Sequence, residues 1–246
     1  MPSFPDPADR NVLAEDCRRC PALVEHRQCI SWGNGPDDAA LVVVGEAPAA
    51  GETRPQGASR DGERGAERPA SEGDPDADRW RGGNLTGMAY TSRRSGRKVR
   101  ELVADVGYAG DAYYTNAVKC FPPDPDDPSD NREPTPEERA NCRPYLVEEI
   151  RQVDPVAVLA TGKHATESVL AVDDRELDGF LDAVLEPVHC EGLETTLLPL
   201  VHPSYQEVWI GRLGYSYGEY VEAIRERLAG AGGRSEADAD SDAVGD

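Results

Sequence analysis

Short apolar runs alternate with longer amphipathic segments along the chain, a pattern typical of strands alternating with helices. The run "LVVV" at 41–44 is β-branched and ends at the loop "GEAPAAG", so it predicts a buried strand followed by a turn. Three further segments predict strands in the same way: 112–119, 156–160 and 196–201. The segments between them that we predict to be helical are 95–106, 136–152, 163–171 and 216–229.

The helix predicted at 136–152 has the best-marked start. Thr135 supplies an N-cap oxygen, Pro136 suits the first turn, and two glutamates follow, which the positive end of a helix favours. The alternation of strands and helices favours an α/β fold with a mainly parallel sheet and helices on both faces. Ligands bind beyond the carboxyl ends of such strands, and the loops there are "GEAPAAG", "NAVKC" and "HPS". We therefore expect these three loops to converge on one edge of the sheet.

Three segments lie outside this pattern. Residues 52–83 are rich in Gly, Pro, Arg, Asp and Glu and have almost nothing to bury, so we interpret them as a solvated insertion. The same reasoning predicts a disordered acidic tail at 230–246, and "DPDDPSDN" at 124–131 is a shorter acidic insert. The remaining chain, 1–229, is predicted to form one domain that carries the long insertion.

The chain is strongly acidic. Its 246 residues include 47 Asp plus Glu against 26 Lys plus Arg, which gives a formal net charge of −21. Such a surface repels nucleic acid in dilute buffer, but adaptation to high salt produces the same composition, because the screening length falls to about 3 Å at 1 M salt. Net charge therefore does not exclude a DNA substrate. We expect a cytoplasmic protein with no membrane partner, since the start "MPSFPDPADRN" is polar and no apolar run approaches about 20 residues.

Six cysteines are present, and a reducing cytoplasm favours metal binding over disulfides for any that cluster. A CxxC pair and two distant cysteines beside the proline-rich loop make a four-sulfur site possible, which suits zinc or an iron–sulfur cluster. The four are Cys17, Cys20, Cys120 and Cys142. The alternative is that the last two are buried as small hydrophobic side chains. Cys29 is a possible substitute ligand, and Cys190 is expected in the core.

Three polar residues follow predicted strands. Asn116 carries a donor pair and an acceptor, which suits the edge of a pyrimidine, although an Asn at a strand end more often caps a turn. His202 could donate to an oxygen that gains negative charge in a transition state. Glu46 could orient a water. For both of these the alternative is a loop side chain that is merely solvated or capping.

The segment "TSRRSGRKVR" places five basic side chains at the start of a predicted helix, where phosphates also meet backbone N–H groups. These are Arg93, Arg94, Arg97, Lys98 and Arg100. The alternative is an ordinary solvated basic face. Farther along, Tyr205 and Trp209 could wedge into a gap left by a displaced base, or could simply pack.

Seven motifs together resemble the iron–sulfur branch of the uracil-DNA glycosylase superfamily, numbered families 4 and 5. They cover most of residues 12–227 in the family order: "CRRCPALVEHR", "VVVGEAPAAG", "TGMAYTSRRSG", "YTNAVKCFPP", "PTPEERANCRPYL", "ATGKHATESVL" and "HPSYQEVWIGRL". The second and fourth look like family 4, and the third and seventh look like family 5. Family 5 carries an Asp where this chain has Arg93, so no catalytic Asp is carried over.

The resemblance implies a three-layer α/β/α sandwich around a central four-stranded parallel sheet. It also implies a structural [4Fe–4S] cluster, with the four cysteines named above as its ligands. We expect a monomeric DNA-repair glycosylase that hydrolyses the N-glycosidic bond of uracil in DNA and leaves an abasic site. The alternatives are a relative that excises another deaminated base, such as hypoxanthine or xanthine, and a non-enzymatic iron–sulfur DNA-binding module. The sequence carries no signal for or against contact with a replication or repair clamp.

The resemblance also assigns roles by position. Asn116 would read the edge of uracil, and Tyr90, where the family usually has Phe, would stack on the ring. The loop with Glu46 and the backbone from Ala47 to Ala49 would position the attacking water. His202 would stabilise the uracil anion as the bond breaks. The expected contacts to DNA come from Arg93, Arg94, Arg97, Ser204 and Tyr205.

Overall fold

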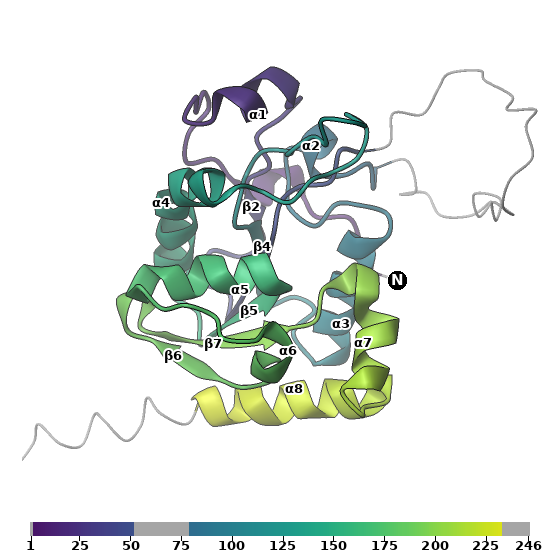
Figure 1. Cartoon of the computed structure of the whole chain (residues 1–246). Helices are drawn as coiled ribbons and strands as arrows, with labels where there is room; N and C mark the ends of the chain where they lie inside the picture. Colours follow the sequence, from purple (N-terminus) through teal and green to yellow (C-terminus); the bar gives the residue numbers. More distant parts are fainter. Residues whose placement is uncertain (1, 52–78, 233–246) are drawn as a thin grey trace, which may run out of the picture.

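A seven-stranded mixed sheet forms the centre of the described part of the chain, in a computed structural model that describes residues 2–51 and 79–232 (Figure 1). The sheet order is β1-β2-β4-β3-β5-β7-β6. The strands are β1 (Arg10–Asn11), β2 (Gly33–Asn34), β3 (Leu41–Gly45), β4 (Ala112–Asn116), β5 (Ala157–Thr161), β6 (Val188–Cys190) and β7 (Thr195–Leu200). The four central strands β4, β3, β5 and β7 are parallel to one another, whereas β1, β2 and β6 pair antiparallel at the edges.

The α/β architecture and the four central parallel strands confirm the sequence prediction. The four strands found lie within a few residues of the predicted ones, and the predicted strand at 112–119 is shorter, because it leaves the sheet after Asn116. The antiparallel edge strands were not predicted, since two or three residues are too few to show a period of two.

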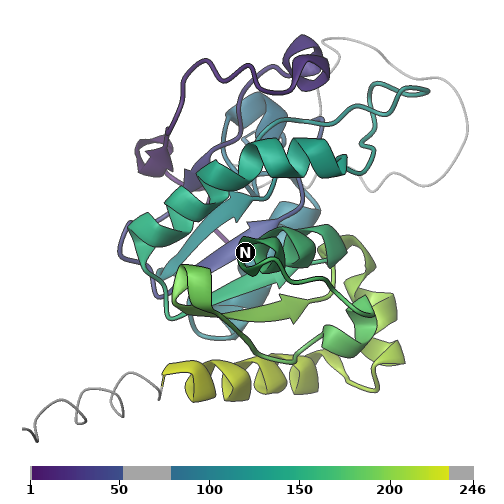
Figure 2. The ribbon, with the colours of Figure 1, turned by 60° about the vertical axis from the view of Figure 1, so that its left-hand side comes forward.

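Helices cover both faces of the sheet, as Figure 2 shows for α4 and α8 on opposite sides. The helices are α1 (Pro21–His26), α2 (Gly83–Thr86), α3 (Ser95–Asp105), α4 (Pro136–Val153), α5 (Lys163–Leu170), α6 (Phe180–Ala183), α7 (Gln206–Arg212) and α8 (Tyr217–Gly232). Successive strand residues point to opposite faces. Val43 therefore packs with the layer of α3, α7 and α8, while Val42 and Val44 pack with the layer of α4 and α5.

The predicted start of α4 is confirmed by its capping hydrogen bonds. The Thr135 hydroxyl accepts from the Glu138 N–H, and the Glu138 carboxylate accepts from the Thr135 N–H, which together form a capping box. Arg132 also forms an ion pair with Glu138 at 2.6 Å. A third hydrophobic cluster packs this end of α4 against α1 and includes Leu23 and Trp32. The N-terminal segment is thus attached to the body of the domain beside α4.

The boundary predicted for the long insertion is wrong at its end. Trp80 is 1% exposed and Arg81 pairs with Ser92 in a β-bridge, so residues 79–83 belong to the packed domain. Their burial was missed because one tryptophan among glycines and arginines gives no apolar pattern. Helix α8 likewise continues to Gly232, into the segment predicted as a tail. The rest of both predictions, 52–78 and 233–246, lies outside the described residues.

The acidic insert at 124–131 lies mostly on the surface, as predicted, and is held by short turns in which Asp124 and Asp127 accept from nearby main-chain N–H groups. Within the described ranges no helix combines the length and apolar character needed to cross a bilayer.

Candidate active site

The carboxyl ends of the four parallel strands meet at one edge of the sheet. The registers pair Gly45 with Asn116 and Thr161 with Leu200, so the four strands end together. The loops that follow enclose a pocket of about 390 Å³. Six predicted site residues line it: Glu46, Ala47, Ala49, Tyr90, Asn116 and His202. The convergence of the three polar loops is therefore confirmed.

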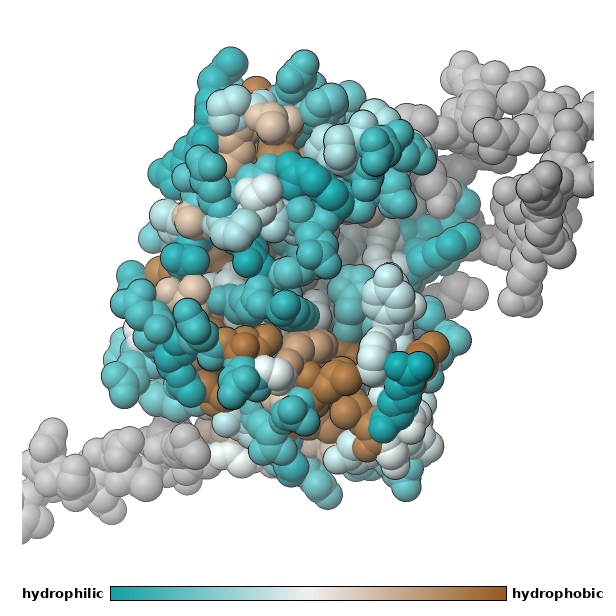
Figure 3. Space-filling view, viewed as in Figure 1, coloured by the Kyte–Doolittle hydropathy of each residue, from teal (hydrophilic) through white to brown (hydrophobic). Residues whose placement is uncertain are grey.

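A larger open hollow of about 1470 Å³ adjoins this pocket and shares Glu46 and His202 with it. Its wall includes Ser204, Tyr205 and Trp209, together with Phe180 and Leu181 of α6. Apolar side chains gather over α6 and α7 on the face drawn in Figure 3. The narrow pocket thus opens onto a broader surface that is partly apolar.

Asn116 ends β4 at the floor of the pocket. Its side chain is 4% exposed, and its Nδ2 atom has no hydrogen-bond partner in the described part of the protein. The amide oxygen lies against Gly45, where a Cβ would come within 2.5 Å of it, so a glycine is required at that position. Buried amide donors are nearly always paired in folded proteins. An orphaned donor that lines a pocket therefore points to a ligand that accepts a hydrogen bond.

Tyr90 forms part of the wall beside Asn116. Its hydroxyl shares a 2.7 Å hydrogen bond with the Thr161 hydroxyl, and its ring meets Tyr114 edge-on with centroids 5.8 Å apart. Burial raises the pKa of the Tyr90 hydroxyl above its ordinary value, so it stays protonated. The backbone of Tyr90 has φ 52°, a left-handed conformation that non-glycine residues rarely adopt. The Arg100 guanidinium holds this conformation by donating to the Tyr90 carbonyl at 3.1 Å.

Glu46 lies where the narrow pocket meets the open hollow. Burial raises the pKa of its carboxyl, and the neighbouring carboxylate of Glu133 adds to this, while His164 and Arg139 act in the opposite direction. His164 belongs to a charged network on that wall: Arg139 Nη1 lies 2.5 Å from its Nδ1, and Glu133 Oε2 lies 3.1 Å from its Nε2. A carboxylate with a raised pKa accepts protons more readily near neutral pH.

His202 occupies the wall formed by the loop after β7. Its Nδ1 accepts a hydrogen bond from the Ser204 N–H at 3.2 Å, which places the ring proton of the neutral form on Nε2. Burial lowers the pKa of the imidazole below its ordinary value, so the neutral form prevails at pH 7. The neutral ring therefore carries its one N–H donor on Nε2.

Part of the predicted basic surface is confirmed. Arg93, Arg94, Arg97 and Ser204 line a common hollow of about 1000 Å³ at the start of α3. Arg100 does not belong to this surface, because it is 9% exposed and donates to Asn34 Oδ1 at 2.6 Å inside the domain. Burial lowers the pKa of its guanidinium to about 10. Its burial follows from the helical period, since it lies on the same face of α3 as Val99 and Val103.

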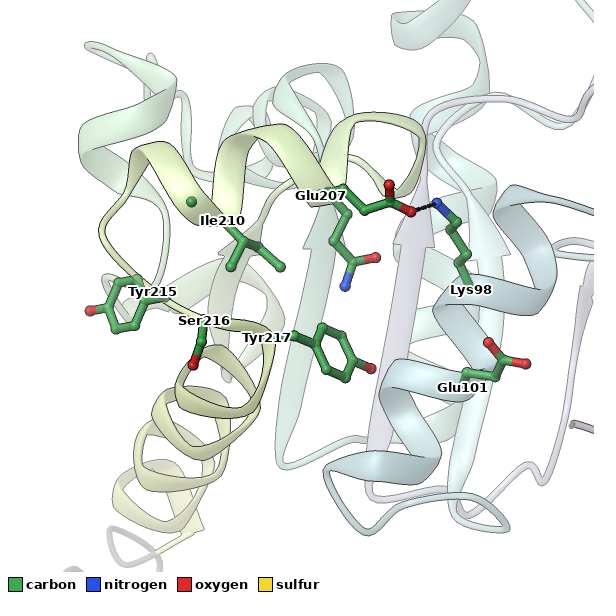
Figure 4. A pocket seen from close by; sticks show the side chains of 9 residues that line it. Lys98, Glu101, Glu207, Ile210, Tyr215, Ser216 and Tyr217 are labelled. Atoms are coloured by element: carbon green, nitrogen blue, oxygen red, sulfur yellow. Dashed lines mark hydrogen bonds and ion pairs between the residues drawn. The ribbon is translucent and has the colours of Figure 1, made fainter.

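Lys98 lies at the same hollow, as predicted, and so does the carboxylate of Glu101, but the charge of Lys98 is paired. Lys98 forms an ion pair with Glu207 of α7 at 2.8 Å across the mouth of a separate pocket of about 850 Å³ between α3 and α7 (Figure 4). That pocket includes Tyr215 and Tyr217, and it contains two carboxylates, Glu101 and Glu207. A lysine that is already paired with one carboxylate and lies beside a second is poorly suited to bind a phosphate.

The two aromatic residues after His202 have different environments. Tyr205 is 61% exposed beside the open hollow, and its ring lies 6.0 Å from that of His202. Trp209 packs against the core cluster instead, under the guanidinium of Arg212 at 4.6 Å. Of the two, Tyr205 is the one available to a large partner.

The four predicted metal-binding cysteines gather in the third hydrophobic cluster. Cys120 and Cys142 are buried, and Cys17 and Cys20 pack against them. Three of the four sulfurs face hydrogen-bond donors: Arg27 Nη1 to Cys120 at 3.4 Å, the Lys119 N–H to Cys142 at 3.4 Å, and Asn141 Nδ2 to Cys20 at 3.6 Å. Tyr145 lies beside the fourth, Cys17. This donor set fits a four-thiolate site, because each sulfur has a polar neighbour that stabilises negative charge.

Burial raises the pKa of three of these thiols, those of Cys20, Cys120 and Cys142, which favours the uncharged thiol in the absence of a cation. Burial raises the pKa of Cys142 to about 12, so a thiolate there needs a compensating cation. Among the described residues, no three His, Cys, Asp or Glu side chains stand in an arrangement that would hold a metal ion as they are. Cys29 lies outside the group, with its sulfur 3.9 Å from the Leu85 carbonyl, and Cys190 is 0% exposed in the core, as predicted.

Comparison with known proteins identifies the family. A family profile described as "Uracil DNA glycosylase superfamily" matches residues 32–228. The chain belongs to this superfamily. A protein named type-5 uracil-DNA glycosylase from Pyrobaculum aerophilum is 31% identical to it over 246 aligned residues, covering 88% of this chain and 90% of the relative.

Relatives of both types are similar to the chain. One named type-4 uracil-DNA glycosylase, from Archaeoglobus fulgidus, is 26% identical over 193 residues, which cover 76% of each protein. Another named type-5, from Mycobacterium leprae, is 26% identical over 259 residues, covering 89% of this chain and 94% of the relative. This agrees with the mixture of family 4 and family 5 motifs in the sequence.

Sequence reasoning assigned no role to several residues of the site. Thr161 ends β5 and lines the narrow pocket, and His164 on α5 lines the open hollow. Lys119 and Glu149 lie beneath Asn116. The helical period offered a signal for Glu149, which falls on the same face of α4 as Leu146 and Ile150. Lys119 stands in the apolar stretch "AVKCF", which is also unusual for a charged side chain.

Proposed function

We propose that the protein is a uracil-DNA glycosylase, which hydrolyses the N-glycosidic bond of uracil in DNA and leaves an abasic site. The observation that carries this proposal is the orphaned amide of Asn116 in a pocket with Glu46 and His202. An unpaired buried donor costs about 1–3 kcal/mol, so a partner that accepts from it is favoured. Uracil presents an accepting O4 next to a donating N3–H, which complements the two ends of a carboxamide.

A base inside a duplex cannot reach this pocket, so the nucleotide has to be flipped out of the stack. The arginines at the start of α3 lie beside Ser204, a suitable place for phosphates on either side of the flipped nucleotide. The exposed ring of Tyr205, the residue after Ser204, lies at the open hollow and is suited to fill the gap that the base leaves. The flipped base would lie against the ring of Tyr90 and pair with Asn116.

The bond between C1′ and N1 breaks with its electron pair remaining on the base. A water then bonds to C1′, and the Glu46 carboxylate accepts a proton from it as a general base. The departing uracil carries negative charge, to which the Nε2–H of neutral His202 donates. A preorganised donor of this kind is typically worth about 3 kcal/mol of barrier.

We further propose that Cys17, Cys20, Cys120 and Cys142 hold a [4Fe–4S] cluster. When bound, such a cluster would serve as a structural crosslink rather than supply electrons to a hydrolytic reaction. The cysteines would then tie the N-terminal segment to the loop after β4 and to α4. The support for this is the gathering of the four thiols and the donors beside them.

The test incubates purified protein with labelled oligonucleotides at high salt and then cleaves abasic sites with alkali. Strand breaks that depend on uracil are the expected result. Breaks only with hypoxanthine or xanthine would favour the alternative of a relative with another base preference. No break with any of the three, with binding retained, would favour a non-enzymatic DNA-binding module.

A further inference from the structure

A buried ion pair lies directly beneath the residue that the proposed function assigns to base recognition. The side chain of Lys119 is 1% exposed and that of Glu149 on α4 is 0% exposed. Lys119 Nζ donates to Glu149 Oε2 at 2.5 Å, to the Thr115 hydroxyl at 2.6 Å and to the Asn116 main-chain carbonyl at 2.6 Å. An ammonium group has three N–H donors, so all of them are used.

The carboxylate of Glu149 is satisfied as completely as the ammonium. Its Oε1 accepts from the Gly33 N–H at 2.9 Å, and its Oε2 also accepts from the Thr115 hydroxyl at 2.5 Å. The pair therefore links helix α4 and strand β2 to the end of strand β4. These three elements meet beneath the pocket and are remote from one another in sequence.

The network fixes the peptide group that follows Asn116 at both of its ends. Its carbonyl accepts from Lys119, and its N–H, that of Ala117, donates to the Gly45 carbonyl at 2.7 Å. The next N–H, that of Val118, donates to the Glu46 carbonyl at 2.9 Å. The direction of a Cβ atom is fixed by the backbone N and C atoms on either side of its Cα. Anchoring this peptide therefore helps to hold the Asn116 side chain toward the pocket.

Stability does not account for the pair. Replacing a buried ion pair by uncharged side chains of similar volume is often neutral or stabilising, because desolvation of the two charges offsets their attraction. What an uncharged replacement would not supply is a donor aimed at the Asn116 carbonyl. We propose that Lys119, held by Glu149, is a positioning residue that orients Asn116 for base recognition. This inference rests on the proposed function, since it acts through the reader Asn116.

The test uses the full-length double variant Lys119→Met/Glu149→Gln. It removes both charges together, so no uncompensated charge stays buried, and the glutamine oxygen still accepts from the Gly33 N–H. Single-turnover excision of uracil from an oligonucleotide is measured, because product release then does not mask the chemical step. We expect the rate to fall about tenfold, while affinity for undamaged duplex DNA, iron content and melting temperature stay close to those of the parent protein.

A double-mutant cycle with Asn116→Ala separates positioning from a general structural effect. If Lys119 acts through Asn116, removing the ion pair in the Asn116→Ala background should cost no more than about twofold. A full tenfold loss in that background, or a parental rate for the charge-free variant, would overturn the inference. A parental rate for Asn116→Ala itself, or no uracil excision by the parent protein, would instead refute the reader's role or the proposed function.

Two further variants complete the test. Arg151→Met is the matched control, because Arg151 also donates to a main-chain carbonyl, that of Gly192, on a loop far from the pocket. It should excise uracil at the parental rate. Should the charge-free variant not accumulate as folded protein, Thr115→Val removes one acceptor of Lys119 while keeping both charges. The rate of uracil excision by Thr115→Val should fall severalfold, but it should fall little further when Asn116 is already alanine. Losses of activation free energy that add in the Thr115→Val/Asn116→Ala variant would again overturn the inference.

Discussion

The Asn116 side chain offers a prediction in which stability and activity move in different directions. Truncation by Asn116→Ala removes a buried Nδ2 that has no hydrogen-bond partner among residues 2–51 and 79–232. That orphaned donor costs the free protein about 1–3 kcal/mol, which the truncation recovers. The loss of packing beside Gly45 acts against this gain. We therefore expect a free energy of unfolding equal to or slightly above that of the parent protein.

Excision should respond in the opposite way. The proposed complex loses two hydrogen bonds between the amide and the base, together worth about 2–3 kcal/mol, which corresponds to roughly 30- to 150-fold in rate. The assay is single-turnover excision from a uracil-containing oligonucleotide at high salt, alongside thermal unfolding of the same samples. Asn11→Ala is the control, since Asn11 bonds to Gln152 on the surface.

Two outcomes would refute the reasoning. Near-parental excision by Asn116→Ala would remove this residue from base recognition. A large drop in melting temperature together with lost activity would show that the amide is a structural element rather than a reader of the base.

Three further changes test other parts of the site. Cys120→Ser should lose the iron and its brown colour and should lower the melting temperature, whereas an unchanged iron content would point to Cys29 as the fourth ligand. Because the Glu46 carboxylate is the active form and burial raises its pKa above 4.5, excision should decline on acidification at a higher pH than for an ordinary Glu. Glu46→Gln should be slow at every pH, and a parental pH profile for it would exclude Glu46 as the base. Tyr205→Ala should leave the melting temperature unchanged, since this ring is 61% exposed. It should slow uracil excision from duplex DNA more than from single-stranded DNA, and equal effects on the two substrates would argue against a wedge.

The sequence predicted the central sheet well because each central strand is a continuous apolar run closed by a polar loop. That pattern depends only on burial on both faces, so it is visible without any tertiary information. The convergence of Glu46, Asn116 and His202 followed from the rule that carboxyl ends of parallel strands share an edge. Their separate roles came from the family motifs, because a lone Asn or His at a strand end has several ordinary explanations.

What sequence reasoning missed depends on contacts between distant segments. The sequence groups Arg100 with the arginines proposed to contact phosphates because its neighbours are basic, yet it faces the core and holds the backbone of Tyr90. Lys98 does lie at that surface, but its ion pair was not predicted, because its partner Glu207 lies more than 100 residues away along the chain. Trp80 gave no signal within a glycine- and arginine-rich segment. Charge alone does not tell which face of a helix a side chain occupies.

The attachment of the N-terminal segment has a consequence for aggregation. Strand β2 covers the outer side of β4 through a single residue pair, Asn34 with Tyr114, and β1 lies beyond it. An uncovered strand at the edge of a sheet is a template for pairing with other chains. If the cysteines hold the proposed cluster and the segment detaches when that cluster is lost, the backbone of β4 becomes such a template. Metal-depleted protein should then form β-rich oligomers, so the four thiols would protect the sheet from self-association as well as anchoring the chain.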